Sequence, residues 1–198
     1  MRIRDGTTVA NAEQLQILQL GAAAWNEWRA RNRHETVDLA GADLMGASLV
    51  GCDLSAANLA NADLSLTHLQ RTSLLRANLL DATMNGAALF GADLRGANLR
   101  GSDLRAAILR GASLHGADLR DADLVGCDMT RANVTMMTLG HTTLGSSKTL
   151  GAAIGLSTII HDSKSFIDLD AIDGHVVSLP DEFLLGVGCE KEEVEAFR

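Results

Sequence analysis

The chain has 198 residues, which is enough for one domain with a substantial hydrophobic core. Its residues are 46% hydrophobic and 21% charged, and the net charge of -8 argues against a general nucleic-acid binder. No apolar run approaches the ~20 residues of a membrane-spanning helix, and three Cys without framework spacing exclude a disulfide scaffold. We therefore expect a reduced, cytoplasmic protein that has no signal peptide and does not associate with membranes.

Residues 1–36 are predicted to form an N-terminal helical cap. Apolar residues recur at spacings of three and four over residues 11–32, which is typical of an amphipathic helix, and Asn11 is the expected N-cap. Both tryptophans of the chain, Trp25 and Trp28, lie in this segment. We expect their rings to cover the start of the next segment, and we prefer this role to one in ligand binding.

A strict repeat of five residues follows. From Leu39 to Leu144 every fifth residue is apolar, giving 22 consecutive positions with 19 Leu, two Met and one Val. Two residues before the apolar centre lies a small residue in 20 of the 22 repeats, and this residue is Ala in 14 of them. The exceptions are Val37 and Met137, and the residue between the two positions is usually Asp or Asn. Gly stands two residues after the apolar centre in ten repeats. A period of five matches neither a helix, with its period of 3.6, nor a flat strand, with its period of 2.

The period is explained if each pentapeptide forms one side of a polygonal coil and the chain turns at every corner. The apolar centre and the small residue then point inward, the Asp or Asn points outward, and Gly occupies the corners, where a positive φ is needed. A narrow axis has room for one large and one small inward residue per side. The predicted inward ladder includes Leu44, Leu64, Leu94, Leu104 and Leu124.

Residues 92–101 read ADLRGANLRG and match the pattern Ala-(Asp/Asn)-Leu-x-x twice without a departure. The sequence therefore resembles the pentapeptide-repeat proteins, and the resemblance covers residues 37–146, which hold all 22 repeats. It implies an all-β solenoid, namely a right-handed quadrilateral β-helix with four repeats per coil. We expect this β-helix to carry the N-terminal α-helical cap and a short mixed C-terminal tail.

Residues 147–198 are predicted to form a degenerate last coil followed by an acidic C-terminal cap or connector. The repeat loses its register after Leu144, and the apolar segment 150–160 is expected to hold the degenerate coil. Pro180 is predicted to start a short helix, and residues 190–197 a second one.

The flanks of the repeat also resemble those of larger bacterial proteins. Residues 21–29, 37–41 and 178–188 are similar to the opening and the connector of bacterial pentapeptide-repeat proteins that carry a C-terminal Toll/interleukin-1 receptor-type or other effector domain. This sequence contains no such domain. The resemblance implies either a stand-alone relative or a truncated form.

No catalytic, cofactor-binding or metal site is predicted. The six His residues lack ligand spacing, and no Gly-rich loop follows the strand–loop–helix pattern of a phosphate site. Cys52 and Cys127 occupy the small inward position, where Cys behaves as a slightly larger Ala. The outward Asp residues are expected to accept hydrogen bonds from corner amides. We therefore predict that the protein is not an enzyme and needs no cofactor.

The candidate interaction surface consists of outward apolar residues and arginines, namely Leu66, Leu75, Leu80, Phe90, Arg95, Arg100, Arg105, Arg110 and Arg120. The first four arginines hold one position in four successive repeats and should form a belt around one coil, with Arg120 above Arg100. A simpler role for the arginines is pairing with aspartates, at most about 1 kcal/mol for each exposed pair. The aspartates in reach are Asp93, Asp103, Asp118 and Asp123.

These features favour a non-enzymatic protein–protein interaction scaffold or adaptor, built on a rigid rod that could also serve as the N-terminal arm of a larger effector. Its partner is expected to be another protein rather than nucleic acid, and the sequence also permits a homodimer. The alternative is a DNA mimic that binds a type II topoisomerase such as DNA gyrase and modulates fluoroquinolone sensitivity, as some pentapeptide-repeat proteins do. Mimicry requires a sustained negative face, whereas an arginine belt crosses the repeat region.

Overall fold

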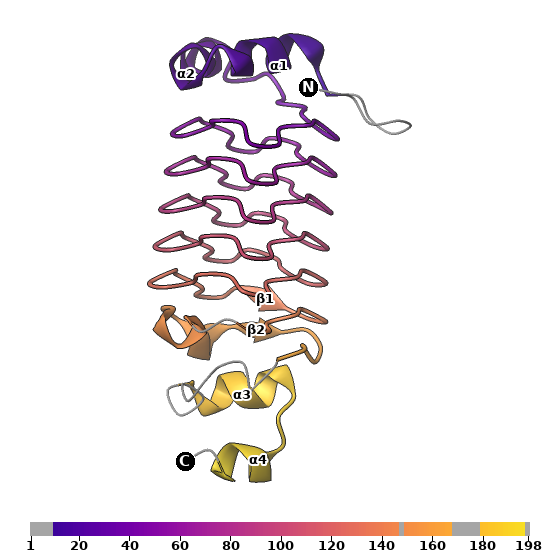
Figure 1. Cartoon of the computed structure of the whole chain (residues 1–198), viewed down its shortest axis with the longest axis vertical. Helices are drawn as coiled ribbons and strands as arrows, with labels where there is room; N and C mark the ends of the chain where they lie inside the picture. The colour runs from indigo at the N-terminus through magenta and orange to yellow at the C-terminus, as the bar shows by residue number, and fades with distance from the viewer. Residues whose placement is uncertain (1–9, 147–148, 168–178, 197–198) are drawn as a thin grey trace.

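The computed structural model describes residues 10–146, 149–167 and 179–196. The molecule is an elongated stack of flat coils with two helices at each end (Figure 1). The elements are α1 (Ala12–Gln19), α2 (Ala22–Arg31), β1 (Thr138–Leu139), the 3-10 helices η1 (Leu150–Ala152) and η2 (Leu156–Thr158), β2 (Ile160–His161), α3 (Asp181–Val187) and α4 (Lys191–Ala196).

The coils are stacked by parallel backbone pairing at a constant interval. Asp38 pairs with Asn58, and Asn58 with Asn78, so the partner lies 20 residues further along the chain. Four pentapeptides therefore complete one coil, which has four faces. Each side contributes a single bridge residue because the chain turns at both of its ends. The predicted β-helix solenoid is confirmed.

Each face is defined by one column of outward residues. Face 1 carries Asp38, Asn58, Asn78, Asn98, Asp118 and Thr138. Face 2 carries Asp43, Asp63, Thr83, Asp103, Asp123 and Thr143. Face 3 carries Ser48, His68, Ala88, Ile108 and Asp128. Face 4 carries Asp53, Ser73, Asp93, Ser113 and Asn133.

The core is a continuous ladder along the axis of the stack. Leu64, Leu94, Leu104 and Leu124 are completely buried, and Leu44 in the first coil is 5% exposed. Each fully buried side chain of this kind contributes roughly 1.5–3 kcal/mol. Where the small inward residue is polar, its hydroxyl bonds a carbonyl of the stack.

The corners have one backbone conformation throughout the repeat. All ten Gly residues two positions after an apolar centre have positive φ, and so do the other corners, such as Leu66 at 57° and Arg71 at 56°. The corner is the third residue of a four-residue turn, closed for example by the hydrogen bond from Ala77 N to Leu74 O of 3.0 Å. A positive φ at this place is the requirement of a type II turn.

The outward Asp and Asn residues stabilise these turns, as predicted. Each of the nine Asp and four Asn side chains at the outward position accepts a hydrogen bond from the backbone N–H two residues later. On face 1 the amides also bond from coil to coil, with Asn78 Nδ2 donating to Asn58 Oδ1 at 3.1 Å and Asn98 Nδ2 to Asn78 Oδ1 at 3.0 Å. The commonest outward residues are therefore structural.

The N-terminal segment forms two helices, whereas the sequence predicted a single helix over residues 11–32. Asn11 caps α1 as expected, because its Oδ1 accepts hydrogen bonds from the N–H groups of Glu13 and Gln14. The helix ends at Leu20, and Gly21 has a φ of 95°, which is incompatible with a continuous α-helix. The break lets α1 and α2 lie side by side across the end of the stack (Figure 1).

No coil precedes the first one, and polar side chains of these two helices provide some of the hydrogen-bond partners that such a coil would provide. In later coils the N–H of the outward residue bonds the preceding coil, as Asn58 N does with Val37 O. In the first coil, Asp53 N instead donates to Asn26 Oδ1 of α2 at 2.8 Å, and Asp38 N donates to Gln14 Oε1 of α1 at 2.8 Å. The helices thereby satisfy two of the four outward amides at the exposed edge of the stack.

The C-terminal coil is more regular than the sequence indicated. Asn133 pairs with Ile154, Thr138 of β1 with Ile160 of β2, and Thr143 with Phe166, so the intervals are 21, 22 and 23 residues. The sides lengthen by one residue each, and η1 and η2 lie within this longer coil. Stacking thus continues where the sequence predicted a degenerate coil, and Ile154 lies in an outward column rather than at an inward centre.

Helix α3 closes the lower end of the stack. Its Phe183 and Leu184 are 1% and 0% exposed, and it begins directly after Pro180, as predicted. The short α4 follows at Lys191. The remaining parts of the predicted tail, residues 147–148, 168–178 and 197–198, lie outside the described residues.

Candidate interaction surface

The arginines predicted to form a belt lie at the four corners of one coil. Arg95 binds Asp93 through two contacts of 2.8 and 2.7 Å, and Arg105 binds Asp103 through contacts of 2.8 and 2.6 Å. Arg105 is also 3.7 Å from Asp123 on the next coil. These three aspartates are among those that the sequence placed in reach.

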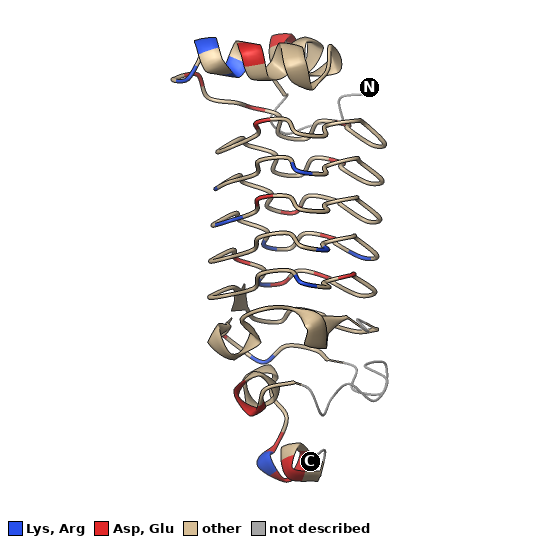
Figure 2. Cartoon of the chain, turned by 90° about the vertical axis from the view of Figure 1, so that its left-hand side faces the viewer, with Lys and Arg blue, Asp and Glu red and all other residues tan. Residues whose placement is uncertain are grey.

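The other arginines of the predicted surface are paired as well. Arg120 lies 2.6 Å from Asp118 and 3.3 Å from Asp162, beyond the repeat. The sequence did not anticipate two further partners: Asp121 binds Arg100 at 3.3 Å, and Asp128 binds Arg110 at 3.1 Å. Charged residues of both signs are therefore spread over the coils (Figure 2).

These pairs hold the carboxylates in their charged form. Hydrogen bonds from Arg105 keep the pKa of Asp103 below its ordinary value, and those from Arg95 do the same for Asp93. Because the arginines of these pairs are exposed to water, the pairs contribute little to stability. The aspartate neutralises the charge of its arginine and occupies some of the guanidinium N–H groups, so the arginine attracts an anionic ligand less strongly.

The four predicted apolar residues separate into two groups. Leu66 is 59% and Phe90 45% exposed, and they occupy the two corners on either side of face 3. Leu75 and Leu80 are half-buried and occupy the two corners on either side of face 1. The structure therefore does not bring the four residues into one patch.

Face 3 has three further exposed apolar residues that the sequence analysis did not select. Met45 is 63% exposed on the corner between faces 2 and 3, and Val50 is 43% exposed on the corner between faces 3 and 4. Ile108 is 44% exposed in the outward column itself. The sequence contained the signal for Ile108, because an apolar residue stands there at an outward position that is usually Asp or Asn. Grouping outward residues at intervals of 20 would have placed it on the same face as the other residues.

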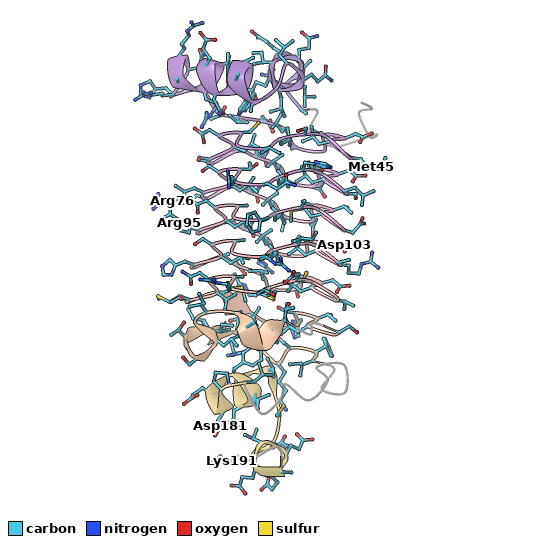
Figure 3. The ribbon with its side chains drawn as sticks, turned by 60° about the vertical axis from the view of Figure 1, so that its left-hand side comes forward. Met45, Arg76, Arg95, Asp103, Asp181 and Lys191 are labelled. Carbon is cyan, nitrogen blue, oxygen red and sulfur yellow. The ribbon has the colours of Figure 1, made fainter. Side chains whose placement is uncertain are left out.

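Together these residues form an apolar strip, defined as Met45, Val50, Leu66, Phe90 and Ile108. It runs from the first coil to the fourth, or about 14 Å at a coil spacing of ~4.8 Å. Figure 3 shows Met45 on the side of the rod opposite to Arg76 and Arg95. All five residues lie on face 3 or on its two corners, so the strip belongs to one side of the molecule.

A pocket of about 570 Å³ continues the apolar strip toward the N-terminal helices. Leu15 and Leu18 of α1 form one wall, and Met45, Ser48 and Val50 of the first coil form the other. Its lining is mixed, with Gln19, Asp43 and Ser48 as its polar residues, and its apolar wall can hold an apolar side chain. The pocket exists because α1 and α2 lie across the end of the coil.

The tryptophans lie between α2 and the first coil and do not line this pocket. Trp25 is completely buried, and its Nε1 donates to Asp53 O at 2.8 Å. The partly buried Trp28 packs against it, with 5.2 Å between the ring centroids.

Other reactive groups offer little chemistry. Burial raises the pKa of the Cys52 thiol to about 11 and that of Cys127 to about 12, so both thiols are protonated at neutral pH. Among the residues that the structure describes, no group of three His, Cys, Asp or Glu side chains could hold a metal ion. In the same residues, no helix is long and apolar enough to cross a membrane.

Comparison with known proteins agrees with the repeat geometry. The family model for pentapeptide repeats, which describes eight copies, matches residues 38–74, 57–101 and 97–135. This chain belongs to the pentapeptide-repeat family. Membership implies the right-handed quadrilateral β-helix, and the bridges at intervals of 20 residues agree with four repeats per coil.

Several solved pentapeptide-repeat structures are similar to the chain. One from the cyanobacterium Cyanothece 51142 is 40% identical over 47% of this chain, with a TM-score of 0.46, and the match spans 64% of that protein. HetL from Nostoc sp. strain PCC 7120, described as involved in heterocyst differentiation regulation, is 30% identical over 65% of this chain and 74% of its own, with a TM-score of 0.27.

The fluoroquinolone resistance protein QnrB1, which is plasmid-mediated, is 18% identical over 68% of this chain and 79% of its own, with a TM-score of 0.26. At this identity the likeness concerns the repeat fold alone. No curated protein matches the sequence significantly.

Proposed function

We propose that this pentapeptide-repeat protein is a non-enzymatic protein-interaction module whose binding surface is the apolar strip. The observation that carries the proposal is the gathering of five large apolar side chains, 43–63% exposed, around one face of the rod. The inward ladder is already complete without them. Their burial against a partner would therefore stabilise a complex without any change in the core.

The backbone suits this role because it holds the surface rigidly. In a typical repeat, Leu74 N donates to Asp93 O, Arg76 N to Arg95 O and Asn78 N to Ala57 O, all at 2.7–2.9 Å. Every side is thus bonded to the coils above and below. A partner would meet a preformed surface and would not have to order it on binding.

The same surface would serve a free adaptor or a rod that forms the N-terminal arm of a larger effector. Mimicry of DNA toward a topoisomerase is less well supported, because it requires uncompensated negative charge. Face 2 has the most aspartates, but Arg105 contacts both Asp103 and Asp123 there. We therefore favour the interaction module.

Site-specific photocrosslinking in the native host tests the proposal. A crosslinking amino acid is placed at Leu66 on the apolar strip or, as a control, at Met136 on the corner between faces 4 and 1. The two sites are matched, since they have φ values of 57° and 55° and exposures of 59% and 51%. We expect a discrete protein adduct from position 66 alone. Adducts from both sites, or from neither, would refute the apolar strip as the binding surface.

A further inference from the structure

We propose that the apolar strip and the adjoining pocket bind an acidic amphipathic helix of a partner protein. The inference rests on the proposed function and adds the chemistry of the partner. It follows from the charges around the strip, from the shape of the surface and from the state of the chain's own acidic helices.

The surroundings of the strip are basic although the chain as a whole is acidic. Face 3 and its two corners, among the described residues, carry four arginines and a single aspartate: Arg71, Arg105, Arg110, Arg131 and Asp128. The whole chain has a net charge of -8. The exposed apolar residues thus coincide with a local excess of positive charge, which favours an acidic partner.

Two of these arginines are free to bind a ligand. Arg105 and Arg110 are engaged by Asp103 and Asp128. Arg71 and Arg131 are exposed, and neither guanidinium forms an ion pair or a hydrogen bond with any described residue. Both lie on the corner between faces 3 and 4, which also carries Phe90. A helix lying on the strip would bring acidic residues on one of its flanks to this corner.

The shape of the surface fits a helix with one protruding apolar anchor. The strip is about 14 Å long, which corresponds to roughly ten residues of α-helix at 1.5 Å per residue. Side chains at spacings of three and four on such a helix would cover Leu66, Phe90 and Ile108. The pocket at the end of the strip would take one further large apolar side chain beside Met45 and Val50.

A second copy of the chain is a poor occupant. Its acidic helices α3 and α4 bury most of their apolar residues within their own chain, with Phe183 at 1%, Leu184 at 0% and Val194 at 5% exposure, and Leu185 is a single exposed exception at 41%. The described part of the chain thus has no free acidic amphipathic helix to offer. A flat face of the second rod could cover the strip but could not enter the pocket.

The test begins with a selection that leaves the peptide sequence open. A yeast-displayed library of 15-residue peptides is selected against the whole chain, and enriched peptides are synthesised and titrated by fluorescence anisotropy. We expect enriched peptides to be acidic, with apolar residues at spacings of three, four and seven. Binding should weaken as ionic strength rises, because Arg71 and Arg131 are exposed.

Two pairs of variants locate the binding site. Arg71→Glu and Arg76→Glu change two exposed arginines, both with a φ of 56° and both without an ion pair among the described residues, but only Arg71 borders face 3. Leu66→Glu and Met136→Glu form the corresponding apolar pair. We expect Arg71→Glu and Leu66→Glu to weaken binding at least tenfold, and each control to change it less than twofold. Circular dichroism and unfolding midpoints serve as the control that all four variants are folded.

The opposite results would overturn the inference. These are enrichment of basic peptides, equal losses in both members of a pair, or no peptide whose binding depends on Leu66. Binding of duplex DNA that Arg71→Glu abolishes, or a dimer that Leu66→Glu dissociates in sedimentation, would assign the face to another occupant. If position 66 crosslinks a protein in the host while no acidic helical peptide binds, the inference fails but the interaction module stands.

Discussion

At the scale of single residues, the corner position decides how the chain turns. Twelve corners of the repeat are not Gly and still have a φ between 51° and 61°. A residue with a Cβ in this region costs about 1–2 kcal/mol. The stack holds the conformation because the corner amide is bonded to the next coil, as Arg76 N is to Arg95 O at 2.9 Å. Leu66 and Arg71 are thus strained corner residues that present side chains where Gly would present none.

Two Gly→Ala variants separate backbone strain from steric overlap. At Gly111 (φ 64°) an added Cβ meets no atom of the described residues within 4 Å, so Gly111→Ala should lower the free energy of unfolding by about 1 kcal/mol, from strain alone. At Gly155 the Cβ would lie 2.9 Å from Thr135 Cα, so Gly155→Ala should cost at least about 1 kcal/mol more. Urea unfolding measures both, and equal losses would contradict the overlap.

At the scale of elements, the helices complete the hydrogen bonding of the end coils. Asn26 of α2 both accepts from Asp53 N and donates to Gly51 O, at 2.8 and 2.9 Å. Trp25 adds a bond to Asp53 O from a fully buried ring. The helix thus gives the N–H and C=O of Asp53 the partners that a preceding coil provides in the rest of the stack.

Asn26→Ala should loosen the first coil. The variant leaves Asp53 N–H and Gly51 C=O without these partners, a loss of about 1–2 kcal/mol. Hydrogen exchange should accelerate in residues 37–56 and stay unchanged in residues 97–116. Asn32→Ala is the matched control, because among the described residues the Asn32 side chain bonds only Trp28 O, which belongs to the same helical segment. Uniform acceleration along the rod would contradict a local role.

The attachment of α3 should depend on pH through His161. Its ring lies 5.8 Å from that of Phe183, and burial lowers the pKa of the imidazole. Its Nδ1 is buried and has no hydrogen-bond partner among the residues that the structure describes. At a pH above the ordinary His pKa of about 6.5 the imidazole is neutral, so its burial beside Phe183 requires no loss of a proton. As the pH falls below this value the unfolded chain binds a proton that the folded chain resists, so stability declines until the pH passes below the lowered pKa.

The measurement compares the wild type with His161→Phe, which keeps an aromatic ring but cannot ionise. Their difference in free energy of unfolding should shift in favour of the variant between pH 7.5 and pH 5. The other histidines are common to both proteins and cancel in this difference. A difference independent of pH would show that His161 does not control the attachment of α3.

At the scale of the whole molecule, the 20-residue interval makes coils exchangeable. Residues that bridge along a face differ by 20 positions from Asp38 to Thr143. The ladder, the corners and the turn bonds recur in every side. Stability is therefore approximately a sum over coils and the contacts between them.

Removing one complete coil should leave a folded, shorter rod. Deletion of residues 77–96 would bring Asn58 beside Asn98 and His68 beside Ile108, so every column stays intact. Deletion of only residues 77–83 would leave a side of three residues, too short to reach the next corner. We expect cooperative thermal unfolding for the longer deletion and loss of folding for the shorter one, by circular dichroism. The reverse order would refute the modular stack.

The sequence predicted the rod, its inward ladder and its corners because these depend on neighbours within five residues. It did not predict the two-helix arrangement or the lengthened last coil, since Gly21 and the sides beyond residue 146 do not follow the repeat. Of the residues chosen for the candidate surface, Leu66 and Phe90 lie beside face 3, while Leu75 and Leu80 lie beside face 1. The sequence analysis selected each outward residue separately and did not group residues that lie 20 positions apart on the same face.

The period of five by itself determined which side chains point inward and where the chain turns, because both follow from the geometry of a single side. Only the closed tertiary structure decided which outward residues meet. Met45 and Ile108 are 63 positions apart, yet they belong to one strip because the coil closes every 20 residues. The ion pairs and the pocket likewise depend on contacts between coils and helices, which no local pattern contains. The stacking of coils therefore determines which surface residues are neighbours, and the repeat determines which side chains form the core.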